Sequence, residues 1–125
     1  MYEIERAELE AIVMAAVATL PDEFREQIAN VEFGVEDWAR TDDYARTTTP
    51  SGSTILGVYR GIPLTKRGSG YNMTLPDRIV IFQQPLQRLA ADADDLADRV
   101  RHVVKHEIAH YFGISDDRLR EIDAY

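Results

Sequence analysis

Residues 105–116 of this 125-residue chain read KHEIAHYFGISD, and they indicate both a fold and a chemistry. It contains the spacing H-E-x-x-H, with His106 and His110 four residues apart. On a helix this spacing separates two side chains by about 40° of rotation and about 6 Å of rise, so both imidazoles can bind one small cation. Glu107 lies about 60° from His110 on the same helix. Its carboxylate can therefore take a proton from water bound to that metal.

A third metal ligand is expected beyond the end of this helix. Catalytic zinc usually takes three protein ligands and one water, and two histidines are too few. Gly113 tolerates a positive φ and can end the helix, so that the chain turns back toward the metal. Asp116 follows that turn, six residues after His110. We predict a Zn²⁺ site made of His106, His110 and Asp116, with Asp117 as the alternative acidic ligand.

Three further side chains are candidates for the same site. His102 continues the histidine row, but it lies about 6 Å before His106, so one ion cannot be held by both ends of the row. We interpret His102 as a partly exposed helix residue. Tyr71 and Tyr111 are candidates to donate a hydrogen bond to the oxyanion of a tetrahedral intermediate. Tyr71 is the better candidate because it lies in a glycine-rich loop, where its alternative role is to anchor that loop.

The rest of the chain alternates helical and strand patterns. Apolar residues at helical spacing predict the helices, and period-two alternation or β-branched runs predict the strands. In chain order we predict helices at 3–19 and 22–30, strands at 31–36, 55–59 and 78–82 with a brief edge piece at 62–65, a helical turn at 85–91, a long helix at 94–112 capped by Asp92 or Asp94, and a short helix at 115–122. Pro21 is expected to open the second helix. Aperiodic segments at 38–53 and 66–75 are predicted surface loops. The fold class is α+β, in a single domain over residues 1–125.

Composition restricts the classes of partner. Hydrophobic residues make up 45% and charged residues 29% of the chain, as in ordinary globular proteins. The net charge of −8 disfavours binding to nucleic acid or to anionic membranes. The chain has no cysteine, which excludes disulfides and thiolate metal sites. The apolar run at 11–18 is too short to cross a bilayer and follows acidic residues, unlike a signal peptide. We therefore predict a cytoplasmic protein without a nucleic-acid or membrane partner.

The motif resembles the H-E-x-x-H-x-x-G-x-x-D signature of the minimal zincins, a family of small bacterial zinc metallopeptidases that was formerly a domain of unknown function. HEIAHYFGISDDRL carries the signature, and the segments LPDEFREQIANVEFGVED, LGVYRGIPLTKRG and LPDRIVIFQQPLQR also resemble the family. The likeness covers most of residues 3–122. It implies a reduced zincin fold, with N-terminal helices and a motif helix packed on a small mixed sheet. It also implies that His106, His110 and Asp116 bind zinc and that Glu107 is the general base.

The sequence thus predicts a zinc metallopeptidase that hydrolyses a peptide or a small amide. Glu107 would assist attack by zinc-bound water and pass the proton to the leaving nitrogen. Zincins commonly hold substrate extended along a sheet edge, here the strand near 54–59 or 78–82. The alternative is a non-catalytic protein-binding module with a structural or vestigial metal site. Glu107 distinguishes the two, because a structural site has no use for a base. The oligomeric state does not follow from the sequence.

Overall fold

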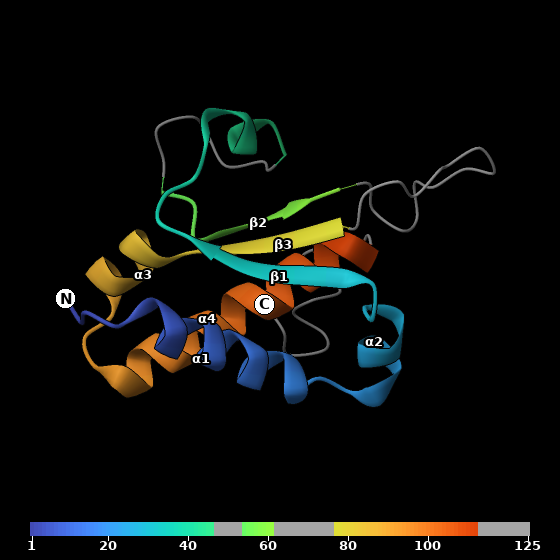
Figure 1. Ribbon diagram of the computed structural model, residues 1–125, viewed down its shortest axis with the longest axis horizontal. Coiled ribbons are helices and arrows are strands. Elements are labelled where there is room, and N and C mark those ends of the chain that lie inside the picture. The colour runs from blue at the N-terminus through green and yellow to red at the C-terminus, as the bar shows by residue number, and fades with distance from the viewer. Residues whose placement is uncertain (47–53, 62–76, 113–125) are drawn as a thin grey trace.

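The centre of the fold is a three-stranded mixed sheet in the order β1-β3-β2, seen in a computed structural model that describes residues 1–46, 54–61 and 77–112 (Figure 1). Strand β1 (Val31–Glu36) runs parallel to β3 (Asp77–Phe82), and β2 (Gly57–Arg60) runs antiparallel to β3. Parallel strands need a crossover connection. Here the segment of chain between β1 and β3 contains β2, which pairs with the opposite edge of β3 from β1. The predicted α+β class with a small mixed sheet is confirmed.

Four α-helices and one 3₁₀-helix surround this sheet in the described parts of the chain. They are α1 (Arg6–Ala18), α2 (Asp22–Gln27), η1 (Thr41–Arg46), α3 (Gln83–Leu89) and α4 (Ala93–Phe112). Helices α1 and α4 contact each other and cover the same face of the sheet, whereas η1 lies against β2 on the opposite side (Figure 1). The predicted metal helix thus runs directly beneath the strands.

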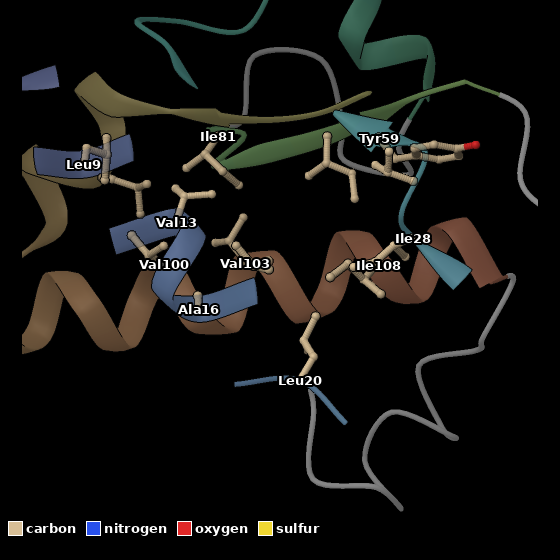
Figure 2. Close-up of a cluster of buried hydrophobic side chains, with 14 of the residues drawn as sticks. Leu9, Val13, Ala16, Leu20, Ile28, Tyr59, Ile81, Val100, Val103 and Ile108 are labelled. Atoms are coloured by element: carbon tan, nitrogen blue, oxygen red, sulfur yellow. The ribbon is translucent and has the colours of Figure 1, made fainter. Parts of the chain in front are cut away.

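The main hydrophobic core lies between the sheet and the pair of helices. Figure 2 shows Leu9 and Val13 of α1 meeting Val100 and Val103 of α4 below Ile81 of β3. Each apolar side chain of this size contributes about 1.5–3 kcal/mol when it is fully buried. The core therefore holds α4 to the sheet along most of its length.

Strand β3 is buried on both faces, as its continuous apolar run predicts. Ile79 and Ile81 face the helices, while Val80 and Phe82 face the other side, and all four are fully buried. On that other side Phe82 and Val80 form a second cluster with Ile55 and Val58, against which Tyr44 and Ala39 pack. A central strand with two covered faces needs apolar residues at every position.

The predicted helix over 3–19 begins later, at Arg6, and the prediction for its first turn was wrong. The backbone N–H of Ile4 donates to Oε1 of Gln87 at 3.0 Å, and the carbonyl of Ile4 accepts from Nε2 of Gln83 at 2.8 Å. Two buried side-chain amides thus satisfy both polar groups of the Ile4 backbone outside a helix. The first residues are extended against α3 for this reason.

Other predicted boundaries differ by a few residues. Helix α2 ends at Gln27 and not near residue 30, and Pro21 precedes its first residue. The strand predicted at 55–59 is observed as Gly57–Arg60, and the helical turn at 85–91 is the seven-residue helix α3. The predicted loop at 38–53 contains η1. The edge piece at 62–65, the loop at 66–75 and the short helix at 115–122 lie outside the described residues. No helix within 1–46, 54–61 and 77–112 has the length and apolar character to cross a membrane.

Arg60 ties the end of β2 to two other segments. Its Nε and Nη2 donate to the two carboxylate oxygens of Asp43 at 2.9 and 2.8 Å, and its Nη1 donates to Oε2 of Glu36 at 2.9 Å. The Asp43 side chain is fully buried, so this bidentate pair is formed away from water. Hydrogen bonding to Arg60 lowers the pKa of Glu36 below its usual range. The arrangement fixes η1 and the end of β1 relative to β2.

Candidate metal centre

The helix that carries the motif starts at a reciprocal cap. Asp92 accepts a hydrogen bond from the backbone N–H of Asp95 at 2.8 Å, and Asp95 accepts one from the N–H of Ala91 at 2.9 Å. Of the two predicted capping residues, Asp92 is the one that caps α4. The hydrogen bond from Ala91, followed by one from Arg99, lowers the pKa of the Asp95 carboxyl. These bonds satisfy N–H groups that a helix start leaves without intrahelical partners.

A glycine in β2 lets α4 lie unusually close to the sheet. A Cβ atom at Gly57 would lie 2.5 Å from Cγ1 of Val103 and 3.2 Å from the carbonyl oxygen of Val80. The first distance is shorter than real Cβ contacts, so any side chain at this position of β2 would press against Val103 of α4. Val103 lies one turn before the motif, and this contact therefore sets the height of His106 relative to the edge strand.

Aromatic packing fixes the last turn of α4. Tyr111 is 3% exposed and meets the ring of Tyr59 of β2 edge-to-face, with 5.6 Å between ring centroids. Phe112 packs on Phe24 of α2 at 5.3 Å between ring centroids. The Tyr111 ring belongs to the core.

His106, Glu107 and His110 lie together on α4. The rings of His106 and His110 are 4.6 Å apart between centroids, and Nδ1 of His110 lies 3.4 Å from Oε1 of Glu107. One ligand atom from each of the three residues lies within 4.8 Å of the other two. Within the described parts of the chain, these three residues are the one group of histidine and acidic side chains that could hold a metal ion.

The burial of the three side chains differs in a way that suits their predicted roles. Glu107 is 6% exposed, whereas His106 and His110 are partly exposed at the surface of the helix. A carboxylate is costly to bury unless a positive partner compensates it. A divalent cation beside the two imidazoles would supply that compensation, and Glu107 would face it from the buried side.

The donor set fits zinc. Zn²⁺ prefers imidazole nitrogen and carboxylate oxygen at about 2.0–2.2 Å, which places two tetrahedral ligand atoms about 3.3 Å apart. His106 and His110 supply two imidazole donors that lie within 4.8 Å of one another. Two histidines leave a catalytic site short of one protein ligand. Asp116, predicted for that position, lies outside the described residues, and so do Asp117 and Tyr71.

His102 does not belong to this group. Its ring is stacked on that of His106 at a centroid distance of 6.5 Å and an interplanar angle of 13°, one turn back along α4. The side chain is exposed. The interpretation of His102 as a helix residue outside the ligand set therefore agrees with the geometry.

The family model for zincin-like metallopeptidases matches residues 28–125. The chain belongs to this family. The match includes the whole of the sheet and the motif helix, and the predicted minimal-zincin resemblance is thereby confirmed. It also extends over the residues beyond 112 in which the predicted third ligand lies.

A solved structure supports the same fold for this zincin. A conserved hypothetical protein from Thermus thermophilus is 18% identical and superposes with a TM-score of 0.58, covering 95% of this chain and 100% of its own. At that identity the likeness concerns the fold alone. No curated protein matches the zincin chain.

Two residues that shape the site were missed at the level of sequence. Gly57 sets the approach of α4, and Arg60 fixes the edge strand that lies beside it. A glycine inside a strand pattern is a known sign of close backbone approach and was the available signal for Gly57. Arg60 gave no signal, because its partners are 17 and 24 residues away.

Proposed function

We propose that this protein is a zinc-dependent metallopeptidase that hydrolyses peptide or small amide bonds. His106 and His110 hold the ion, Asp116 completes the ligand set, and Glu107 is the general base. The observation that carries the proposal is the buried Glu107 carboxylate, placed beside two imidazoles on a helix whose position is fixed by the core. Membership of the zincin-like family supports the same interpretation.

The chain's own residues would divide the work of hydrolysis. When bound, zinc supplies a Lewis acid that polarises the scissile carbonyl and acidifies a water molecule. His106 and His110 hold the site at one end of α4. Glu107 accepts a proton at its carboxylate and returns it to the nitrogen of the departing amine. Because Glu107 is shielded from bulk water, its proton is directed to the reacting groups and not lost to solvent.

The sheet suggests how a peptide is held. The N–H of Phe82 donates to the carbonyl of Leu56 at 3.0 Å, so this pair is hydrogen-bonded, and antiparallel pairing alternates along the strands. The backbone groups of Gly57 therefore face away from β3, toward the outer edge of β2. Among the described strands β3 alone pairs with β2.

A substrate segment in extended form would add to the outer edge of β2, above α4. Of the two strands considered from sequence, the one at 78–82 is central in the sheet and has both edges occupied. Of the two, only β2, the strand that includes Gly57 and Tyr59, has an edge that no other described strand occupies.

Glu107 also separates this proposal from a non-catalytic module. A site that held a structural metal would gain nothing from a buried carboxylate that lies beside the two imidazoles and is suited to proton transfer. We expect Glu107→Gln to keep zinc bound at wild-type stoichiometry and to abolish zinc-dependent cleavage of a random peptide mixture, followed by mass spectrometry. Cleavage that survives in this variant would refute the assigned base.

Metal content tests the ligands independently of any substrate. We expect His110→Ala to lose bound zinc, measured per chain by elemental analysis after dialysis against a weak chelator. His102→Ala is the matched control, because it removes an imidazole from the same helix outside the ligand group, and it should keep its zinc. Asp116→Ala should weaken zinc binding as well. Equal zinc content in all variants would place the metal elsewhere.

A further inference from the structure

A pocket lies beside the metal centre, one turn before it along α4. Its walls are Leu56, Asp98, Arg99, His102 and Val103, and its volume is about 250 Å³. It opens between the residue that leads into β2 and the helix face that continues into His106. Pockets for drug-sized ligands occupy about 300–1,000 Å³, so this one suits a single amino-acid side chain.

The charged groups of the pocket are already paired with neighbours on α4. The Asp98 carboxylate forms an ion pair with Arg101, and Nε of Arg99 donates to Asp95 at 3.1 Å. The pocket therefore carries one charged group of each sign, and the two cancel. It offers no net charge that would select a charged ligand side chain.

Apart from His102, the remaining lining is apolar. Val103 is 6% exposed, and Leu56 packs against the main core while keeping part of its side chain at the surface. An aliphatic side chain placed here would cover apolar surface that water now contacts, at a gain proportional to the area buried.

The location of the pocket relates it to a bound peptide. His102 forms one wall, and its ring lies 6.5 Å from that of His106. The pocket therefore lies next to the candidate metal ligands along α4, with the His102 ring between them. A peptide added to the edge of β2 at Gly57 passes directly beside Leu56.

We propose that this pocket is a specificity subsite that takes an aliphatic side chain of leucine size, from a residue near the bond that is cleaved. The proposal rests on the proposed peptidase function. Leu56 and Val103 contact the side chain, and His102 separates it from the metal centre. The preferred substrates are peptides with leucine, isoleucine or methionine at that position.

Binding of a fragment tests the pocket without hydrolysis. N-acetyl-leucinamide should shift the backbone amide NMR signals of residues 98–103 in the zinc-free protein, and it should bind at least about tenfold more tightly than N-acetyl-glycinamide. Leu56→Trp, which fills the pocket, should abolish the shifts. Leu89→Trp is the matched control, since Leu89 is 48% exposed on α3, and it should leave them intact. Equal binding of both fragments, or binding that survives Leu56→Trp, would overturn the proposal.

A second variant protects the test if Leu56→Trp does not fold. His102→Trp narrows the pocket from its exposed wall and should also abolish fragment binding. Cleavage of the peptide mixture by wild type should then show the aliphatic preference at one position, and His102→Trp should shift it toward glycine and alanine. Cleavage with no such preference refutes the subsite alone. Absence of any zinc-dependent cleavage refutes the peptidase and with it the substrate role.

Discussion

Gly57 offers the sharpest test of how this fold positions its metal helix. In Gly57→Ala the new Cβ would lie 2.5 Å from Cγ1 of Val103 and 3.2 Å from the carbonyl oxygen of Val80. Overpacking of a tight core costs about 1–3 kcal/mol. Replacing a strand glycine returns about 0.5–1 kcal/mol by restricting the unfolded chain. We expect a net loss of about 1–2 kcal/mol, which corresponds to a melting temperature lower by roughly 3–8 °C for a chain of this size.

The matched control is Gly34→Ala in β1. A Cβ at Gly34 would contact the guanidinium of Arg78, whose side chain is 41% exposed and can swing away. The free energy of unfolding of Gly34→Ala should stay within about 0.5 kcal/mol of the wild-type value. Both glycines lie in strands beside β3, so the comparison isolates what faces each of them.

A double-mutant cycle completes the test. Val103→Ala removes Cγ1 and should relieve part of the Gly57→Ala penalty, giving a favourable coupling of about 1 kcal/mol in urea unfolding. Additive losses, or a Gly57→Ala variant as stable as Gly34→Ala, would show that α4 is not held at this height by the glycine.

Three further predictions concern stability. Arg60→Gln should cost about 3–5 kcal/mol in urea unfolding, because it leaves the buried Asp43 carboxylate without its bidentate partner, and a loss no larger than that from a surface ion pair would contradict this. Arg60 lowers the pKa of Glu36 in the folded protein, so the stability that Glu36 contributes is present above its unfolded pKa of about 4.3 and is lost as the pH falls further. The stability gap between wild type and Glu36→Gln should therefore shrink from about pH 7 to about pH 3.5, and a constant gap would refute the ion pair. Asp92→Ala should cost about 1 kcal/mol by removing the cap of α4, while Asp94→Ala, in the exposed first turn of the helix, should cost little in the same thermal melts.

Strands whose burial is set by their own residues were predictable from sequence. The run at 78–82 is apolar throughout after Arg78 and is observed as β3 with one added residue, Asp77. The alternation at 31–36 matches β1 at both ends. In both cases the apolar positions along the strand mark the side chains that face a covered side of the sheet, so the local pattern is enough to predict the strand.

Segments held by distant partners were not predictable in the same way. Ile4 has the spacing of a helical residue, yet its backbone is satisfied by Gln87 and Gln83, which are 83 and 79 residues away. Local periodicity contains no information about such pairs. The same holds for η1, which is fixed by the buried pair of Asp43 and Arg60.

In the candidate site, too, the features set by local sequence were predictable and those set by distant segments were not. His106, Glu107 and His110 were identified because four-residue spacing on a helix is local geometry, and the three side chains do lie together. The pocket near Leu56 and the close approach at Gly57 depend on which strand lies above α4. The cytoplasmic location, the lack of nucleic-acid and membrane partners, and the roles of Asp116 and Tyr71 stay predictions.

The burial of α4 bears on the proposed zinc site. Leu96, Val100 and Val104 are completely buried, so the helix is held by the core along its length whether or not a metal is present. In zinc fingers the ion creates the fold, and chelators unfold the chain. Here chelation should remove only the linkage term, about 2.7 kcal/mol at a zinc concentration about one hundred times the dissociation constant. Under the proposed function, the chain without zinc is already folded and can bind, release and rebind the ion without refolding.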